Sequence, residues 1–295
     1  MTEATIAGAI NPAAPSQGYW RRVIRRFLKR RLAVVGAVFL VLLGLAVTFG
    51  PMVSPYSYDY QDFELLGMPG PMSAEHWLGT DELGRDALTR LLHGGRVSLA
   101  VGLAGAMIAG IVGTLVGAVS GFYRGVPDVV LMRFTDVMMS IPTLPLVLLL
   151  SGLFRPSPPL LVAIVGILIW MGTARLVRSQ FLALREREFV EAARALGASG
   201  PRLMFRHILP NAIGPITVAS TLAVGSAIMM ESALSFLGFG IQPPVPTWGN
   251  LLNSASSWLS QAPWLAIPPG LLILFTVLAV NFLGDGLRDA MEPRE

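Results

Sequence analysis

The chain has no cysteine and very little charge for its length. Of its 295 residues, 14% are charged and 53% are hydrophobic, whereas a soluble domain carries about 25% charged residues. Without cysteine there is no disulfide and no thiol nucleophile. This composition excludes an ordinary water-soluble globule and a disordered chain, and it indicates a membrane protein.

Motifs for phosphate binding and hydrolysis are also missing. The only lysine, Lys29, does not follow a glycine-rich loop, so the chain has no Walker A site for ATP. No His-Glu-x-x-His or Gly-x-Ser-x-Gly motif occurs, and the three histidines, His76, His93 and His207, are scattered. We therefore predict no catalytic residue, no metal site and no cofactor bound by this chain. A membrane enzyme is an alternative hypothesis that requires a catalytic cluster.

Long runs without charge are abundant instead. A helix of about 20 apolar residues crosses a bilayer, and continuous runs of this kind do not suit the alternating strands of a membrane barrel. The run 232–284 is too long for one span, and a proline-rich stretch, 241–250, interrupts it. The sequence therefore predicts an all-α membrane protein with six transmembrane helices. The predicted spans are 32–53, 98–122, 129–153, 159–176, 211–237 and 265–283.

The distribution of basic residues predicts the orientation. Seven lysines and arginines precede the first span, which favours a cytoplasmic N-terminus. With Arg133 counted at the inner leaflet, 18 of the 22 lysines and arginines belong to the cytoplasmic side, in segments 1–31, 123–128, 175–210 and 284–295. The outer segments, 54–96, 154–158 and 238–264, hold four: Arg85, Arg90, Arg96 and Arg155. We therefore expect both termini inside.

Small residues repeat along the second span. Gly105, Ala109, Gly113, Gly117 and Gly121 are each four residues apart and share one helical face. Small side chains let helix backbones approach closely in lipid. Two interpretations stay open: packing within this chain, or contact with a second membrane subunit.

Ionisable residues inside spans are rare and costly. Arg133 and Asp136 are three residues apart, so we expect them to pair on one helix face. Glu231 is a candidate for the translocation pathway, or it is held by hydrogen bonds at a helix interface. A proton relay needs several such residues in a chain, and its absence argues against a secondary transporter.

The segment 181–210 predicts a helix, a turn and a second helix. Residues 182–196 form an amphipathic pattern, Gly197 suits a helix C-cap, and Gly200-Pro201 suits the start of a second short helix. Pro210 is expected to end that helix and to begin the fifth span. Because residues 175–206 carry seven arginines and three glutamates, this segment is a solvated charged face or a docking surface.

Several segments resemble one family. Glu191-Ala192-Ala193, then Gly197 and Leu209-Pro210, resembles the EAA loop of ABC-importer permeases, although His207 occupies the family's isoleucine position. The segments 76–86, 234–244 and 284–289 resemble the DppC/OppC-like dipeptide and oligopeptide branch. The resemblance covers most of residues 20–292.

The resemblance implies the fold of a type I ABC-importer permease and half of a translocation pathway for di- or oligopeptides. It implies a second, B-type permease subunit, two cytosolic ABC ATPase subunits that bind ATP and Mg²⁺, and an extracellular solute-binding protein. It also implies a multi-pass location in the bacterial plasma membrane, with no nucleic-acid partner. The ATPase-coupling residues that it implies are Glu191, Ala192, Ala193, Arg194, Gly197, Arg202, Leu209 and Pro210.

Three segments follow from this interpretation. Residues 1–31 are a basic cytoplasmic segment, 32–96 are the first transmembrane helix with an external loop, and 97–295 are the core permease domain with its EAA loop at 181–210. Two alternatives stay open. The same permease role could serve nickel or another small solute, or the chain could be a secondary transporter or channel that needs no ATPase.

Overall fold

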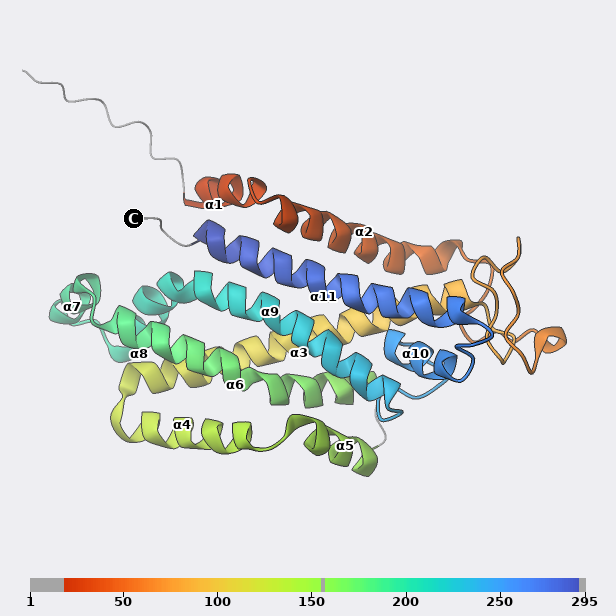
Figure 1. Cartoon of the computed structure of the whole chain (residues 1–295). Coiled ribbons are helices and arrows are strands. Elements are labelled where there is room, and N and C mark those ends of the chain that lie inside the picture. The colour runs from red at the N-terminus through yellow and green to blue at the C-terminus, as the bar shows by residue number, and fades with distance from the viewer. Residues whose placement is uncertain (1–18, 155–156, 292–295) are drawn as a thin grey trace, which may run out of the picture.

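Long helices that run roughly side by side form the body of the protein, and short elements lie at both ends (Figure 1). The computed structural model describes residues 19–154 and 157–291, so the predicted outer position of Arg155 lies outside the described residues. The helices are α1 (Tyr19–Leu28), α2 (Arg31–Val53), η1 (Phe63–Leu65), α3 (Ala87–Tyr123), α4 (Gly125–Ser140), α5 (Thr143–Leu153), α6 (Pro158–Arg185), α7 (Glu188–Ala195), α8 (Gly200–Arg202), η2 (Leu203–Ile208), α9 (Leu209–Phe236), α10 (Trp248–Ser256) and α11 (Pro263–Met291).

Five of these segments are long and apolar enough to cross a membrane: α2, α3, α6, the run Gly200–Phe236, and α11. The third predicted span consists of α4 and α5, which are bent by 82° at the break between them. Pro142 lies at this break, where its missing N–H interrupts the helical hydrogen bonds. The prediction of an all-α membrane protein is confirmed, and the spans number six if the bent pair counts as one.

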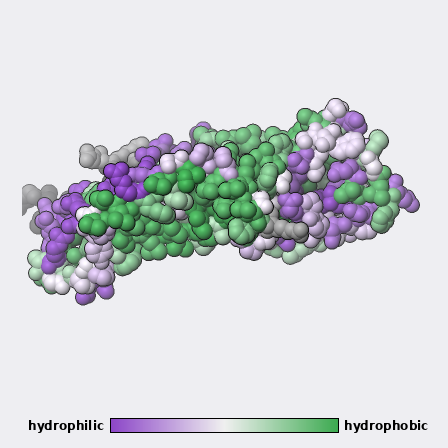
Figure 2. Space-filling model, turned by 90° about the horizontal axis from the view of Figure 1, so that it is seen from below, coloured by the Kyte–Doolittle hydropathy of each residue, from purple (hydrophilic) through white to green (hydrophobic). Residues whose placement is uncertain are grey.

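The surface of the bundle is apolar along its middle. Figure 2 shows hydrophobic residues over the central part of the molecule and hydrophilic residues concentrated towards both ends. Val41, Leu42 and Leu45 of α2 are each at least half exposed, as are Met107 and Ile111 of α3. Soluble monomers rarely expose apolar patches larger than a few hundred Å², so this belt is the surface that lipid would cover.

The two ends differ in the elements that they gather. Helices α1, α7 and α8 and the C-terminal end of α11 lie at one end, here called the α7 end (Figure 1). The loop 54–86 and α10 lie at the other, here called the α10 end (Figure 1). The described part of segment 1–31 and the segment 175–210 are both expected to be cytoplasmic, and they lie at the same end.

The repeated small residues of α3 face α6. Gly113, Gly117 and Gly121 all lie against α6. A Cβ atom on Gly117 would lie 2.4 Å from the carbonyl oxygen of Ala174, and one on Gly121 would lie 2.7 Å from that of Arg178. Packing within the chain therefore accounts for this face, and of the two interpretations it is the one that the structure supports.

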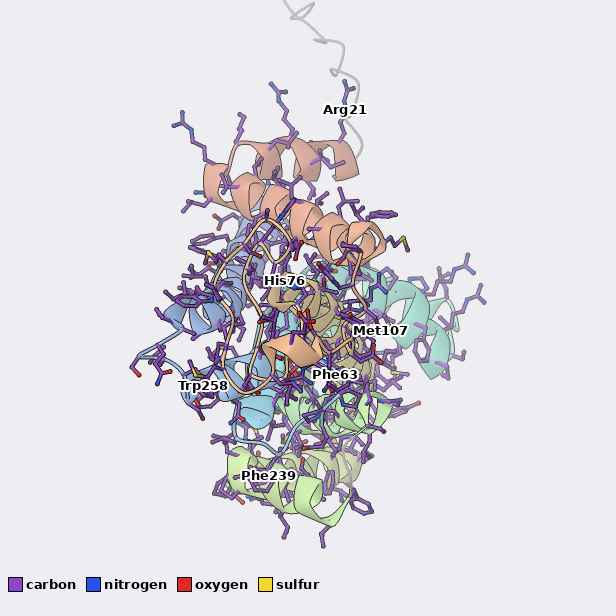
Figure 3. All side chains as sticks on the ribbon, turned by 90° about the vertical axis from the view of Figure 1, so that its right-hand side faces the viewer. Arg21, Phe63, His76, Met107, Phe239 and Trp258 are labelled. Atoms are coloured by element: carbon purple, nitrogen blue, oxygen red, sulfur yellow. The ribbon has the colours of Figure 1, made fainter. Side chains whose placement is uncertain are left out.

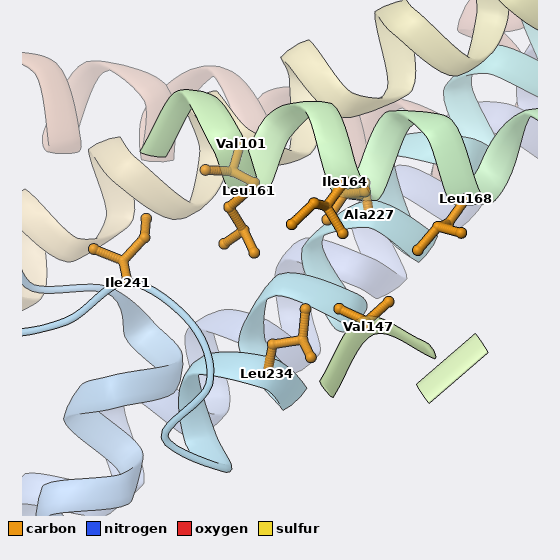
Figure 4. Packing of buried hydrophobic residues seen from close by; sticks show 9 residues of the cluster. Val101, Val147, Leu161, Ile164, Leu168, Ala227, Leu234 and Ile241 are labelled. Carbon is orange, nitrogen blue, oxygen red and sulfur yellow. The ribbon is translucent and has the colours of Figure 1, made fainter. Parts of the chain in front are cut away.

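A buried apolar cluster joins four helices on the α10 side of the bundle (Figure 4). Val101 of α3, Leu161 of α6 and Ala227 of α9 are almost fully buried in it. Val147 brings α5 onto the same cluster and is itself completely buried. The bent segment is thus fixed to the bundle through one face of α5.

Helices α3 and α6 extend beyond the spans that the sequence predicts. Helix α3 begins at Ala87 and not at residue 98, because Asp86 caps it by accepting a hydrogen bond from the backbone N–H of Thr89 at 2.7 Å. Helix α6 continues to Arg185 and not to residue 176. In both cases arginines that suggested the end of a span lie inside a longer helix.

The prediction of a single helix over 182–196 is wrong, because residues 186–187 interrupt it. Helix α6 ends at Arg185, Arg187 is extended, and α7 begins at Glu188. The break redirects the chain so that Val190 packs into the same buried cluster as Phe181.

Pro210 does not end a helix. The chain runs continuously from Gly200 to Phe236 through a π-helical turn, η2, and Pro210 lies in the first turn of α9. A proline inside a regular helix clashes with the carbonyl four residues before it. The wider π turn, with a hydrogen bond from Leu209 N–H to Met204 O, accommodates the ring.

Candidate coupling surface and translocation groove

Helix α7 ends in a Schellman motif at Gly197. The N–H of Gly197 donates to the carbonyl of Arg194 at 3.0 Å, and the N–H of Ala198 donates to that of Ala193 at 3.1 Å. Gly197 has φ of +84°, which a side chain with a Cβ rarely adopts. No atom lies within 4 Å of a Cβ built there, so only the backbone conformation selects glycine. The predicted capping role of Gly197 is confirmed.

The inner side of this loop is anchored to the bundle. Val190 and Ile208 are fully buried, and Leu203 is nearly so. They pack in one cluster with Phe122 of α3 and Phe181 of α6. The inner side of the loop is therefore packed firmly against α3 and α6.

The outer side of the loop is exposed. Leu196 is 89% exposed, and Phe189 and Phe205 are about half exposed. We call the coupling surface the residues 188–206 that face away from the bundle. Of the predicted coupling residues, Glu191, Ala192, Arg194, Gly197, Arg202 and Pro210 are exposed, and Ala193 and Leu209 are half-buried. An apolar surface with flanking charges suits contact with another protein.

Ion pairs connect α4 and the base of the loop to neighbouring helices. Arg178 of α6 donates two hydrogen bonds, of 2.6 and 2.7 Å, to the carboxylate of Asp128 on α4. Arg124, between α3 and α4, pairs with Glu186 at 2.8 Å. The bidentate pair of Arg178 with Asp128 has a fixed geometry, so α4 keeps a defined position against α6 at this end.

The predicted pair of Arg133 with Asp136 is wrong. Asp136 accepts a hydrogen bond of 2.6 Å from Arg175 of α6. Because α6 lies beside α4 at this level, a partner from another helix takes the place of the local one.

A groove of about 1050 Å³ lies between α6 and α9. It extends from Pro210 at the start of α9 to Ser226, and Arg288 and Met291 of α11 close its side at the α7 end. The lining is mostly apolar but includes five polar side chains, those of Thr173, Gln180, Asn211, Ser226 and Arg288.

Glu231 lies outside this groove, in a buried polar network. Its side chain is fully buried and accepts hydrogen bonds from Ser98 of α3 at 2.8 Å and from Ser235 at 2.7 Å. The hydroxyl of Ser98 in turn accepts the backbone N–H of Trp248 at 3.2 Å. Glu231 thus joins α9, α3 and the start of α10, which corresponds to the interpretation as a hydrogen-bonded group at a helix interface. Its pathway role stays a prediction.

The loop before α3 contains a charged cluster that sequence reasoning did not assign. Arg85 donates to Asp81 at 2.8 Å, and Arg90 lies 3.4 Å from the same carboxylate. His76 and Asp86 are 2.9 Å apart. All five side chains are buried. The available signal in the sequence was the presence of five charged residues within positions 81–90.

Comparison with known proteins assigns this architecture. Residues 113–295, more than half of the chain, match the family described as binding-protein-dependent transport system inner membrane component. This chain belongs to that family. Residues 18–69 also match the N-terminal transmembrane domain of oligopeptide transport permease C. The permease is therefore a multi-pass component of an ABC importer in the bacterial plasma membrane.

Curated relatives cover nearly the whole permease. It is 39% identical over 276 residues to an oligopeptide transport system permease protein of Haemophilus influenzae, covering 94% of this chain and 89% of the relative. It is 40% identical over 278 residues to a dipeptide transport system permease protein of Alkalihalophilus pseudofirmus, covering 93% and 90%. It is 41% identical over 276 residues to a glutathione transport system permease protein of Pectobacterium atrosepticum, covering 93% and 91%.

Proposed function

We propose that this permease forms one half of the translocation pathway of an ATP-driven importer for di- and oligopeptides. The observation that carries the proposal is the coupling surface. It exposes Leu196 and Phe189 to solvent, and yet Val190 fixes it to α3 and α6. A surface of this form can receive force from a partner and pass it to the spans.

The partners follow from the same surface and from the family. Two cytosolic ATPase subunits would bind ATP and Mg²⁺, and one of them would cover the coupling surface of this chain. A B-type permease subunit would complete the pathway, and an extracellular solute-binding protein would deliver the solute. Because the chain has no Walker A site, we propose that it is not itself an ATPase.

We propose that the α7 end faces the cytoplasm, with both termini inside. The basic residues concentrate in the segments at this end, in accordance with the positive-inside rule. The α10 end would then face the binding protein. In this orientation the groove between α6 and α9 opens on the cytoplasmic half, and Glu231 lies in the outer half.

We propose that this groove is the part of the translocation pathway that this chain lines. Its polar groups are spaced along α6 and α9, as at Thr173, Gln180 and Ser226. A peptide carries regularly spaced amide groups that such side chains can contact in turn. The names of the oligopeptide, dipeptide and glutathione relatives support a peptide solute.

Two variants of the coupling surface test the proposal. Gly197→Val places a β-branched residue at a positive φ and should misplace α8 without touching the spans. Glu191→Lys reverses an exposed charge on α7. Both should insert normally and retain the B-type subunit, but should lose ATPase association and solute uptake. Affinity copurification of the ATPases and uptake of labelled dipeptide measure the two effects.

Gly67→Val is the matched control. Gly67 also has a positive φ, of +103°, and open space around its Cβ position, but it lies in the loop at the α10 end. It should leave ATPase association intact. Full association and uptake in both coupling-surface variants would refute the coupling role. The solute is tested separately, by competition of unlabelled dipeptide, longer peptide, glutathione and Ni²⁺ against labelled dipeptide uptake.

A further inference from the structure

Helix α1 presents its basic and its apolar residues on different faces. Successive residues of an α-helix are about 100° apart, so residues four apart share a face. Arg21 and Arg25 share one such face, and Ile24 and Leu28 share the next. The segment from Tyr19 to Arg31 contains seven basic residues and no acidic one. This is the pattern of a helix that lies in a membrane interface.

A third face attaches α1 to the rest of the chain. Val23 is 5% exposed, and the ring of Phe27 lies close to Gly286 of α11. Arg30, just after the helix, pairs with Asp289 of α11 at 2.8 Å. These contacts fix the rotation of α1, so its other faces have defined directions.

The remaining faces are open. Ile24 is 57% and Leu28 62% exposed, and Arg21, Arg22 and Arg25 are exposed as well. Arg21 points away from the bundle (Figure 3). No ion pair joins these three arginines to a residue in 19–154 or 157–291. Exposed apolar side chains beside unpaired cations match a phospholipid, which offers acyl chains next to a phosphate.

We propose that α1 is a binding surface for anionic phospholipids of the leaflet at the α7 end. The phosphates would contact Arg21, Arg22 and Arg25, and the first acyl carbons would cover Ile24 and Leu28. The charge favours an anionic headgroup over a zwitterionic one, because each arginine near the surface adds to the attraction. Since α1 is fixed to α11, bound lipid would also hold the end of α11 at a defined depth.

The test is lipid selectivity of the purified full-length chain. It is equilibrated in detergent with phosphatidylglycerol and phosphatidylcholine in equal amounts, and native mass spectrometry measures the ratio of bound lipids. The natural chain should enrich phosphatidylglycerol. Neutralising one arginine should lower the enrichment roughly fivefold. The triple variant Arg21→Gln, Arg22→Gln, Arg25→Gln should bind the two lipids nearly equally.

Two controls separate the lipid site from charge and from folding. The variant Arg21→Lys, Arg22→Lys, Arg25→Lys keeps the charge and should keep most of the enrichment. The variant Arg187→Gln, Arg194→Gln, Arg202→Gln removes the same charge from exposed arginines of the coupling surface and should leave the enrichment unchanged.

Two results would overturn the proposal. One is unchanged enrichment in the glutamine variant of α1. Another is an equal loss in the coupling-surface variant, which would reduce the effect to net charge. Unchanged enrichment together with loss of the ATPase subunits on copurification would identify α1 as a protein-docking surface instead.

Discussion

The contact between α3 and α6 leaves no room for a side chain at Gly117. A Cβ built there lies 2.4 Å from the carbonyl oxygen of Ala174, 2.8 Å from the Cβ of Val177 and 2.9 Å from the backbone nitrogen of Arg178. Two of these three atoms are backbone, so rotation of a flexible side chain cannot relieve the contact. We therefore predict that Gly117→Ala forces the two helices apart.

The cost follows from the size of the misfit. Adding a methyl group to a well-packed core destabilises by about 1–3 kcal/mol, and separation of two long helices places this site at the upper end. For a domain of this size, 1 kcal/mol corresponds to a shift in Tm of about 2–4 °C. We expect the Tm of the Gly117→Ala variant to fall by roughly 6–12 °C.

The assay is size-exclusion chromatography of the detergent-solubilised subunit after heating, with the surviving monodisperse fraction plotted against temperature. Gly44→Ala is the control, because Gly44 lies in α2 and nothing lies within 4 Å of its Cβ position. That variant should be neutral or slightly stabilising, since alanine favours helix over glycine. Equal Tm values for the two variants would refute the close approach of α3 to α6.

Three further predictions concern the network, the orientation and the energy source. Glu231→Ala leaves the buried hydroxyls of Ser98 and Ser235 without their partner and should cost about 1–3 kcal/mol; Glu231→Gln, which retains an acceptor, should cost less in the same heating assay. The natural chain lacks cysteine, and Ser73 is exposed at the α10 end. The variant Ser73→Cys should therefore react with a membrane-impermeant thiol reagent added to intact cells. Reaction only after permeabilisation would reverse the proposed orientation. The purified subunit should hydrolyse no ATP until the ATPase subunits are added, and steady hydrolysis by the subunit alone would contradict its role as a permease.

The membrane helices could be predicted from the sequence because lipid imposes a simple requirement. Every backbone polar group must be satisfied within the span, so long charge-free runs become helices wherever they occur. The ends of the helices were less predictable. Arg90 suggested a loop, but it is buried inside α3, where it donates to the carbonyl of Tyr58 at 2.9 Å and lies close to Asp81. Tyr58 is 32 residues away in the sequence, so nothing near Arg90 indicates this partner.

The polar pairs show the same limit. Spacing along one helix predicted a pair of Arg133 with Asp136, whereas the actual partner, Arg175, comes from another helix. A lone carboxylate at position 231 correctly indicated an unusual polar site, because an unpaired charge in lipid is costly. Its partners belong to α3 and to its own next turn, and only the packing of α3 against α9 brings them together.

Helix α3 connects the α7 end of the permease with the α10 end. It has 37 residues, which gives a length of about 55 Å at 1.5 Å per residue. Near its C-terminal end, Phe122 packs in the cluster that anchors the coupling surface, and near its N-terminal end, Ser98 binds Glu231 and the start of α10. The glycine face of α3 packs directly against the backbone of α6, so sliding of α3 along α6 would require the two backbones to separate. We therefore predict that a displacement of α7 moves α3 and α6 together and strains the contact of Ser98 with the start of α10. We therefore predict that Gly117→Ala weakens the response of the α10 end to the ATPase docking proposed above, even where the subunit remains folded.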